Sequence, residues 1–180
     1  GARHTPLLPD PDPAPPCGTL ILESTYGDTL HESREHRVER LGKVLAQALA
    51  DRGKVLIPAF ALGRTQEVIY EIDRLLASKG MEFLSKVPVL VDSPLALDLT
   101  YITGKLKQYW DEEAKNLLRQ GDHPMDFDRL YAVRKHGDHL KILEMQGPAI
   151  IIAGSGMCSG GRILDHLRAG LENPKTDILF

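Results

Sequence analysis

The chain has 180 residues, of which 42% are hydrophobic and 26% are charged, with a formal net charge of -3. This is the composition of a globular domain with a real core, so disorder throughout the chain is excluded. The charge gives no overall basic footprint, so any contact with nucleic acid would need a local patch or a neighbouring domain.

Composition also bears on the compartment. No apolar stretch is long enough to span a bilayer, and the first residues hold no basic segment followed by an apolar one, so membrane anchoring and export are disfavoured. The two cysteines, Cys17 and Cys158, lie far apart and match no zinc-binding spacing. We therefore expect reduced thiols in a cytoplasmic protein rather than a disulfide framework.

A proline-rich stretch is followed by alternating strands and helices. Prolines remove backbone donors and favour extended structure, so residues 1–17 are expected to be a connector and residues 18–180 a domain. Short apolar runs predict strands at residues 19–22, 55–57, 87–91, 130–133 and 149–153, with a last one from residue 178. Helical spacing of apolar residues predicts helices at residues 33–51, 68–76, 95–109, 111–119, 138–145 and 162–171.

Strands that are nearly all apolar and separated by helices indicate a mostly parallel sheet covered on both faces. The predicted fold is therefore a three-layer α/β domain of the Rossmann-like kind. Ligands of such sheets bind beyond the carboxyl ends of the strands. The loops that follow the strands are thus the places to look for a site.

The loop after the first predicted strand begins with Glu23. A carboxylate at a strand end is held rigidly and can orient or tune a histidine. A simple turn, with Asp28 capping the next helix, explains the same segment.

The next two loops carry Arg64 and Ser93. Arg64 falls in the first turn of a helix, where a cation is unfavourable unless an anion or a carboxylate lies opposite. A salt bridge to Glu67 is the plainer explanation. Ser93 precedes Pro94 and is placed to cap a helix, with a ligand contact by Asp92 or Ser93 as the second interpretation.

The fourth loop, residues 154–162, has four glycines between an apolar strand and a helix. Glycine lets a backbone approach a bound group closely, and free N–H groups at a helix start suit an anion such as phosphate. A purely steric role for the glycines remains open. Cys158 is expected to pack beneath the loop rather than to act as a nucleophile.

The histidines form no zinc-binding sequence motif. HxHxDH, HExxH and paired cysteines are all missing from the chain. We expect His136 and His139 to lie at the surface or to cap a helix, and His31 and His36 to belong to a solvated charged face. The remaining histidines, His4, His123 and His166, look isolated.

Taken in order, residues 23–27, 60–67, 92–96 and 154–162 resemble the motifs of the β-CASP domain of metallo-β-lactamase-fold RNA nucleases. The resemblance runs from about residue 19 to the chain end. By this pattern the chain is most similar to prokaryotic homologues of the nuclease subunit of the cleavage and polyadenylation machinery.

The resemblance implies a domain inserted into a metallo-β-lactamase domain, with RNA entering between the two and two zinc ions at the base of the cleft. It implies hydrolysis of an RNA phosphodiester. Glu23 matches the family glutamate that pairs with the histidine protonating the leaving group, so it is the candidate catalytic residue. The positions expected at the cleft rim, as substrate-binding residues, are Arg64, Ser93, Ser155, Gly156, Gly160 and Gly161.

The zinc ligands of the family lie outside this sequence, so no metal is expected on the fragment itself. We expect an excised β-CASP segment, truncated at its C-terminal end, that is inactive alone. Its expected partners are RNA and the missing metallo-β-lactamase domain, and a homodimer of the parent stays open.

Two other functions compete with the nuclease. A non-catalytic RNA-clamping or protein-interaction module would share the β-CASP architecture in a paralogue that lacks metal ligands. A nucleotide-binding domain would use the glycine loop as a phosphate cradle, but GxGxxG and GxxxxGK[ST] are both missing.

Overall fold

The computed structural model describes residues 3–30, 33 and 35–180. Five parallel strands form one sheet in the order β3-β2-β4-β1-β5. The strands are β1 (Lys54–Pro58), β2 (Val89–Val91), β3 (Leu130–Ala132), β4 (Ala149–Ala153) and β5 (Thr176–Ile178). The α-helices are α1 (Arg37–Ala48), α2 (Arg64–Leu76), α3 (Pro94–Lys105), α4 (Glu112–Arg119), α5 (His136–Glu144) and α6 (Ile163–Gly170), and two short 3₁₀ helices are η1 (Glu82–Lys86) and η2 (Lys107–Tyr109).

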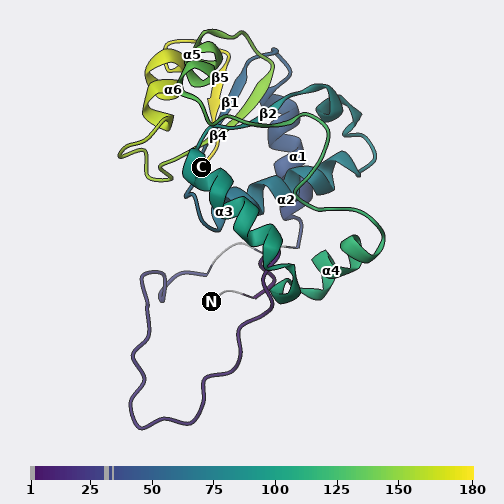
Figure 1. Cartoon of the computed structure of the whole chain (residues 1–180). Helices are drawn as coiled ribbons and strands as arrows, with labels where there is room; N and C mark the ends of the chain where they lie inside the picture. The colour runs from purple at the N-terminus through teal and green to yellow at the C-terminus, as the bar shows by residue number, and fades with distance from the viewer. Residues whose placement is uncertain (1–2, 31–32, 34) are drawn as a thin grey trace.

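The sheet has a core on each face, as a parallel sheet requires. Successive residues of β4 alternate between the two cores, with Ile150 and Ile152 on one side and Ile151 on the other. The larger core packs against α1, α2 and α3, and the smaller one against α5 and α6 (Figure 1). The predicted three-layer α/β fold is confirmed.

Most predicted elements are present with shifted ends. The strand predicted at residues 149–153 has the same ends as β4, and every predicted helix has a counterpart in the structure. The first helix was predicted to begin at residue 33, but it begins four residues later, at Arg37. None of the described helices is long and apolar enough to cross a membrane.

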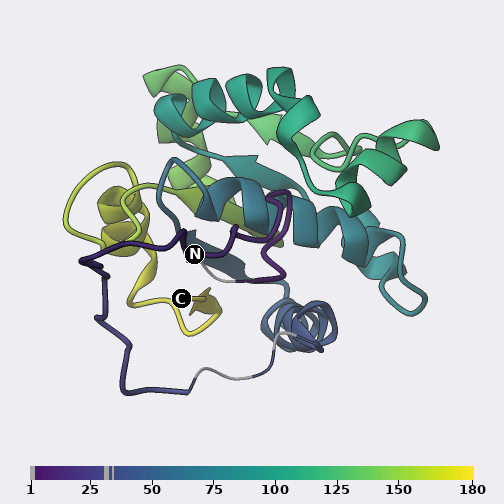
Figure 2. The same cartoon turned by 90° about the horizontal axis from the view of Figure 1, so that it is seen from below.

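The strand predicted at residues 19–22 is wrong. Leu20, Ile21 and Leu22 have no strand conformation and are 61%, 94% and 74% exposed. The segment lies in the part of the chain that extends away from the α/β body (Figures 1 and 2). An apolar run becomes a strand only when a neighbouring strand supplies hydrogen-bond partners, and neither edge of this sheet does so for these residues.

The proline-rich stretch is not wholly a connector. Leu7 is buried in the larger core, and its carbonyl accepts a hydrogen bond from the Asp111 amide at 3.0 Å. Residues 9–30 are exposed throughout. One leucine therefore anchors the start of the chain to the body beside α4.

Candidate functional site

Three of the four loops with candidate residues meet at the carboxyl edge of the sheet. Strand β4 lies between β1 and β2, with Ala153 paired to Pro58 and Ile152 paired to Val91. The loops after these strands therefore start side by side. We call the region formed by residues 59–64, 93 and 154–161 the carboxyl rim.

Close contacts join the loops of the carboxyl rim. A Cβ placed on Gly156 would lie 2.8 Å from the Phe60 ring and 2.9 Å from the Phe60 backbone nitrogen, so only glycine fits there. A Cβ on Gly154 would lie 3.8 Å from the Ser93 hydroxyl. The glycine loop thus packs closely on Phe60 in the loop after β1 and lies near Ser93 in the loop after β2.

The glycine loop is closed on itself by hydrogen bonds. The Ser155 amide donates to the Gly160 carbonyl at 3.0 Å, and the Ile163 amide donates to the Gly154 carbonyl at 3.0 Å. Gly161 has φ of +74°, and a Cβ there would meet the Gly154 oxygen at 2.3 Å. The sequence therefore folds into one fixed turn, and Cys158 packs beneath it against the smaller core as predicted.

Ser93 and Arg64 both make the local contacts that the sequence analysis gave as the simpler explanations, a helix cap and a salt bridge. The Ser93 hydroxyl caps α3 by accepting a hydrogen bond from the Ala96 amide at 3.3 Å. Arg64 lies 3.1 Å from a Glu67 carboxylate oxygen, yet 64% of its side chain is exposed. A guanidinium so placed is available to a further anion.

Gln66 organises the loop that leads to Arg64, a role that sequence reasoning missed. Its side chain is buried, and its oxygen accepts a hydrogen bond from the Gly63 amide at 2.7 Å. Its amide group donates to the Ala61 carbonyl at 3.1 Å and to the Thr100 hydroxyl at 2.8 Å. The signal was present, since a glutamine three residues after a helix start is half of a capping box.

Glu23 does not lie at the carboxyl rim. It follows no strand, it is fully exposed, and its carboxylate accepts a hydrogen bond from the Thr25 amide at 2.7 Å. Hydrogen bonding with Thr25 lowers the pKa of Glu23, which keeps it ionised at neutral pH. The expected gathering of Glu23 with Arg64 and Ser93 at strand tips is therefore wrong for this chain.

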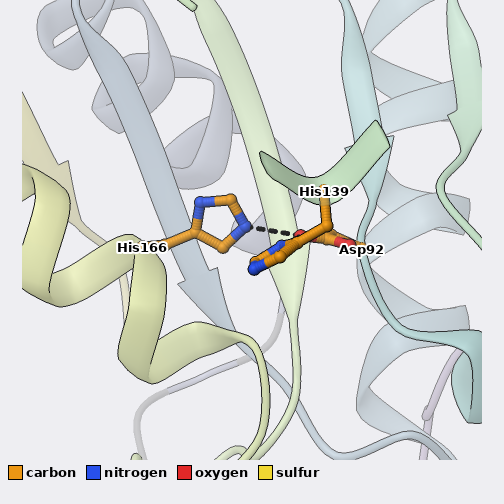
Figure 3. A group of neighbouring side chains, drawn as sticks. All are labelled: Asp92, His139 and His166. Atoms are coloured by element: carbon orange, nitrogen blue, oxygen red, sulfur yellow. Dashed lines mark hydrogen bonds and ion pairs between the residues drawn. The ribbon is translucent and has the colours of Figure 1, made fainter. Parts of the chain in front are cut away.

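Beneath the carboxyl rim, on the side of the smaller core, Asp92 is the centre of a buried polar cluster (Figure 3). The Nδ1 atom of His139 and the Nε2 atom of His166 each lie 2.6 Å from Asp92 Oδ2. Arg162 donates to Asp92 Oδ1 at 2.7 Å. Asp92, His139 and His166 are each at most 3% exposed.

The prediction that His139 lies at the surface is wrong, and so is the description of His166 as isolated. Both histidines fall on the buried faces of their helices, because His139 precedes the core residue Ile142 by three positions and His166 follows Ile163 by three. His36 is exposed and pairs with Glu39, as expected of a charged face. His31 lies outside the described residues.

Hydrogen bonding holds the Asp92 carboxylate in its charged form. Burial alone would raise the pKa of Asp92, but hydrogen bonds from the two histidines and the arginine outweigh burial and lower the pKa to about 2. All three donors point at one carboxylate, so its buried charge is compensated.

Within the described part of the chain, Asp92, His139 and His166 are the group close enough to hold a metal ion. Around tetrahedral zinc, with bonds of about 2.0 Å, ligand atoms stand roughly 3.3 Å apart. The nitrogens here lie 2.6 Å from the carboxylate oxygen, which is a hydrogen-bond distance, and a guanidinium already neutralises that carboxylate. These residues do not fit a catalytic zinc pair.

Comparison with known proteins gives the family. A Beta-Casp domain model matches residues 65–180. The chain belongs to the Beta-Casp domain family. It is 36% identical over 181 residues to ribonuclease TTHA0252 of Thermus thermophilus, with 100% of this chain covered.

Other relatives carry a different name. The β-CASP chain is 31% identical over 169 residues to transcription termination factor FttA of Pyrococcus horikoshii and 32% identical over 171 residues to that of Methanococcus maripaludis, with 92% of the chain covered in each case. The match spans 41% of the ribonuclease and 25% and 26% of the two factors. The chain therefore corresponds to less than half of each of these relatives.

Proposed function

We propose that this β-CASP chain forms one wall of the RNA cleft of a zinc-dependent ribonuclease and contacts RNA phosphates through the carboxyl rim. The observation that carries the proposal is the meeting of Arg64, Ser93 and the glycine loop at one edge of the sheet. The relative named a ribonuclease supports RNA hydrolysis as the activity of the complete protein.

The chemistry of the carboxyl rim suits a phosphodiester backbone. In the described part of the chain, the amide N–H groups of Gly156 and Gly160 donate to no protein acceptor. Unpaired amides in a glycine-rich loop bind anions, and the exposed Arg64 guanidinium adds a positive charge. Contacts of this kind position RNA without reading its sequence.

Zinc belongs to the proposal through the family resemblance, with both ions held by residues outside this chain. The proposed role of Glu23 is to orient a histidine, also outside the chain, that protonates the leaving group. The exposed, ionised Glu23 carboxylate is free for that contact. The exposed Leu20, Ile21 and Leu22 would pack against the metallo-β-lactamase domain of the same polypeptide.

The experiment that tests the carboxyl rim is RNA binding by the complete protein with Arg64→Ala. We expect roughly tenfold weaker binding and a smaller dependence of affinity on salt, because one phosphate contact is lost. The matched control is Arg119→Ala, since Arg119 has a similarly exposed side chain on α4, away from the rim loops. Unchanged affinity and salt dependence in Arg64→Ala would contradict the proposal.

Glu23→Gln in the same protein tests the catalytic role. We expect the cleavage rate to fall about 10²-fold with zinc content and RNA affinity unchanged. Glu172→Gln, at an exposed position outside these loops, is the control. An unchanged rate would remove Glu23 from the mechanism.

A non-catalytic RNA-clamping module is the second candidate, because the carboxyl rim would serve it equally well and some relatives are named termination factors. Binding of RNA by the complete protein without metal-dependent cleavage would support this candidate over the nuclease. We place either protein in the cytoplasm, which agrees with the two free cysteines.

A further inference from the structure

We infer that Asp92 and Arg162 are positioning residues for RNA binding, which hold the glycine loop in register with Ser93 from beneath the carboxyl rim. The inference rests on the proposed RNA contact at that rim. It assigns a function to a buried cluster whose side chains are not proposed to touch RNA themselves.

The cluster joins three segments that are distant in sequence. Asp92 follows β2 and directly precedes Ser93. His139 comes from α5, and Arg162, the last residue of the glycine loop, directly precedes α6, which holds His166. A single carboxylate thus ties the loop after β2 to the loop after β4 and to both helices on that face of the sheet. Figure 3 shows the two histidines beside Asp92.

Arg162 extends the connection to the loop after β3. Its Nη1 atom also donates to the Val133 carbonyl at 2.9 Å, and its Nη2 atom donates to the Arg134 carbonyl at 3.0 Å. A planar guanidinium with three such acceptors has one orientation that satisfies them all. The end of the glycine loop is therefore fixed in direction as well as in place.

The arrangement has consequences at the surface because the rim loops lie side by side. Ser93 is the chain neighbour of Asp92, and the position of a Gly154 Cβ lies 3.8 Å from the Ser93 hydroxyl. Displacement of Arg162 would therefore shift the amides of Gly156 and Gly160 relative to Ser93. Groups that must meet one phosphate chain lose affinity when their spacing changes, even though each of them is still present.

Apolar packing alone would hold α5 and α6 on the sheet, but it would not fix the orientation of the glycine loop. Leu56, Ile142 and Ile163 already form an apolar core beside the cluster. Apolar contacts are non-directional, whereas charge-assisted hydrogen bonds to a carboxylate fix orientation. The presence of four polar side chains at this place is explained by the need to orient the loop.

The test uses the complete protein with Arg162→Lys and Arg162→Met, whose RNA affinity and thermal stability are both measured. Lysine keeps the charge near Asp92 but offers no planar fork, and methionine removes the charge. We expect both variants to bind RNA roughly tenfold more weakly while Arg64 is intact. Leu75→Ala, a core substitution in α2, is chosen as a control with comparable loss of stability.

A double-mutant cycle separates positioning from simple stability. If Arg162 acts by holding the loop against Ser93, Ser93→Thr should weaken binding clearly in the wild-type protein and much less in Arg162→Lys, so the two effects are not additive. Additive effects, or an affinity in the Arg162 variants equal to that of Leu75→Ala, would overturn the inference.

The same measurements keep the two proposals distinct. If Arg64→Ala leaves RNA affinity unchanged, the rim contact fails. If Arg64→Ala weakens binding while the Arg162 variants behave like the stability control, the rim contact stands and positioning by the cluster fails. One zinc ion per isolated chain that is lost in Asp92→Asn would replace positioning by a metal site.

Discussion

At the scale of single residues, Asp92 is the most consequential side chain in the described structure. It is completely buried, yet it is charged, and three donors surround it. A buried charge is tolerated only when partners replace the water that it loses. Stability and loop geometry therefore depend on the same carboxylate.

Asp92→Asn should destabilise the chain by about 3 kcal/mol or more, because Arg162 then keeps a largely buried charge without its counter-charge. Urea unfolding followed by circular dichroism measures the loss. Asp98→Asn is the control, since Asp98 pairs with Arg134 at 2.7 Å where both side chains are more than half exposed. That surface pair should contribute less than about 1 kcal/mol. Equal effects of the two substitutions would contradict the buried role.

Acid should remove the contribution of ionised Asp92 to the free energy of unfolding over a defined pH interval. The pKa of Asp92 is lowered from 3.8 to about 2 in the folded chain. The stabilisation is therefore complete above pH 3.8 and is lost as the pH falls towards 2. Unfolding titrations of the wild type and Asp92→Asn should converge over this interval. Parallel curves would show that ionised Asp92 does not stabilise the fold.

Asp73 presents the opposite electrostatic case. Burial, followed by repulsion from Asp122 and Asp126, raises its pKa to about 7. The folded chain therefore loses stability as the pH rises from 3.8 to 7, and the loss is complete above that range. Asp73→Asn should stabilise the chain by about 1 kcal/mol at pH 8, since partial exposure screens the repulsion. Unfolding at pH 8 and at pH 3.5 tests this, and an equal gain at both would contradict it.

Sequence reasoning recovered part of the residue-level picture. The Ser93 cap and the Arg64–Glu67 pair follow from local rules, so both were foreseen. The Asp92 cluster was not, because its members come from three elements and their meeting depends on strand order. The spacing of His139 from Ile142 and of His166 from Ile163 would have placed both histidines on buried helix faces, but it names no partner for either.

At the scale of elements, α3 depends on one side chain at its start. The Ser93 hydroxyl accepts the Ala96 amide, and Pro94 occupies the first helical position. Caps of this kind satisfy an amide that would otherwise lack a partner. The same hydroxyl is proposed to face RNA, so the two roles must be separated.

Ser93→Ala should reduce stability by about 1 kcal/mol, and Ser93→Asp should preserve it to within a few tenths, because aspartate is an equally good cap. Both are measured by thermal or urea unfolding. The aspartate variant should nevertheless bind RNA more weakly in the complete protein, because its charge repels phosphate. A stability loss in Ser93→Asp equal to that in Ser93→Ala would mean that capping does not explain the position.

Element boundaries show where local sequence stops being informative. Strand β4 was predicted to the residue because it is central and wholly buried. The run at residues 19–22 has the same apolar character but no neighbouring strand. Apolar composition permits a strand, whereas pairing decides whether one forms.

At the scale of the whole molecule, the order of elements predicted the fold well. Alternating strands and helices lead to a covered parallel sheet, and the carboxyl edge then collects the loops that carry Arg64, Ser93 and Ser155. The order of strands does not place Glu23, because Glu23 comes before the first strand of the sheet in the sequence. Its proposed role depends on the family resemblance alone.

The chain alone should not cleave RNA, because its one close group of potential metal ligands within the described residues is a closed hydrogen-bonded cluster. Incubation of the purified chain with zinc and single-stranded RNA should give no cleavage above a buffer control. The complete protein under the same conditions is the positive control. Zinc-dependent cleavage that disappears in His166→Gln would refute this prediction.

The position of β4 in the sheet has a consequence for biosynthesis. This strand lies at the centre and joins β1 to β2, yet it is the fourth of the five strands to be made. Val55 must wait for Ile150 to leave the ribosome before the two can pair. Strand β1 thus has no partner until β4 has been made, and chaperone binding to its apolar residues should weaken once β4 emerges.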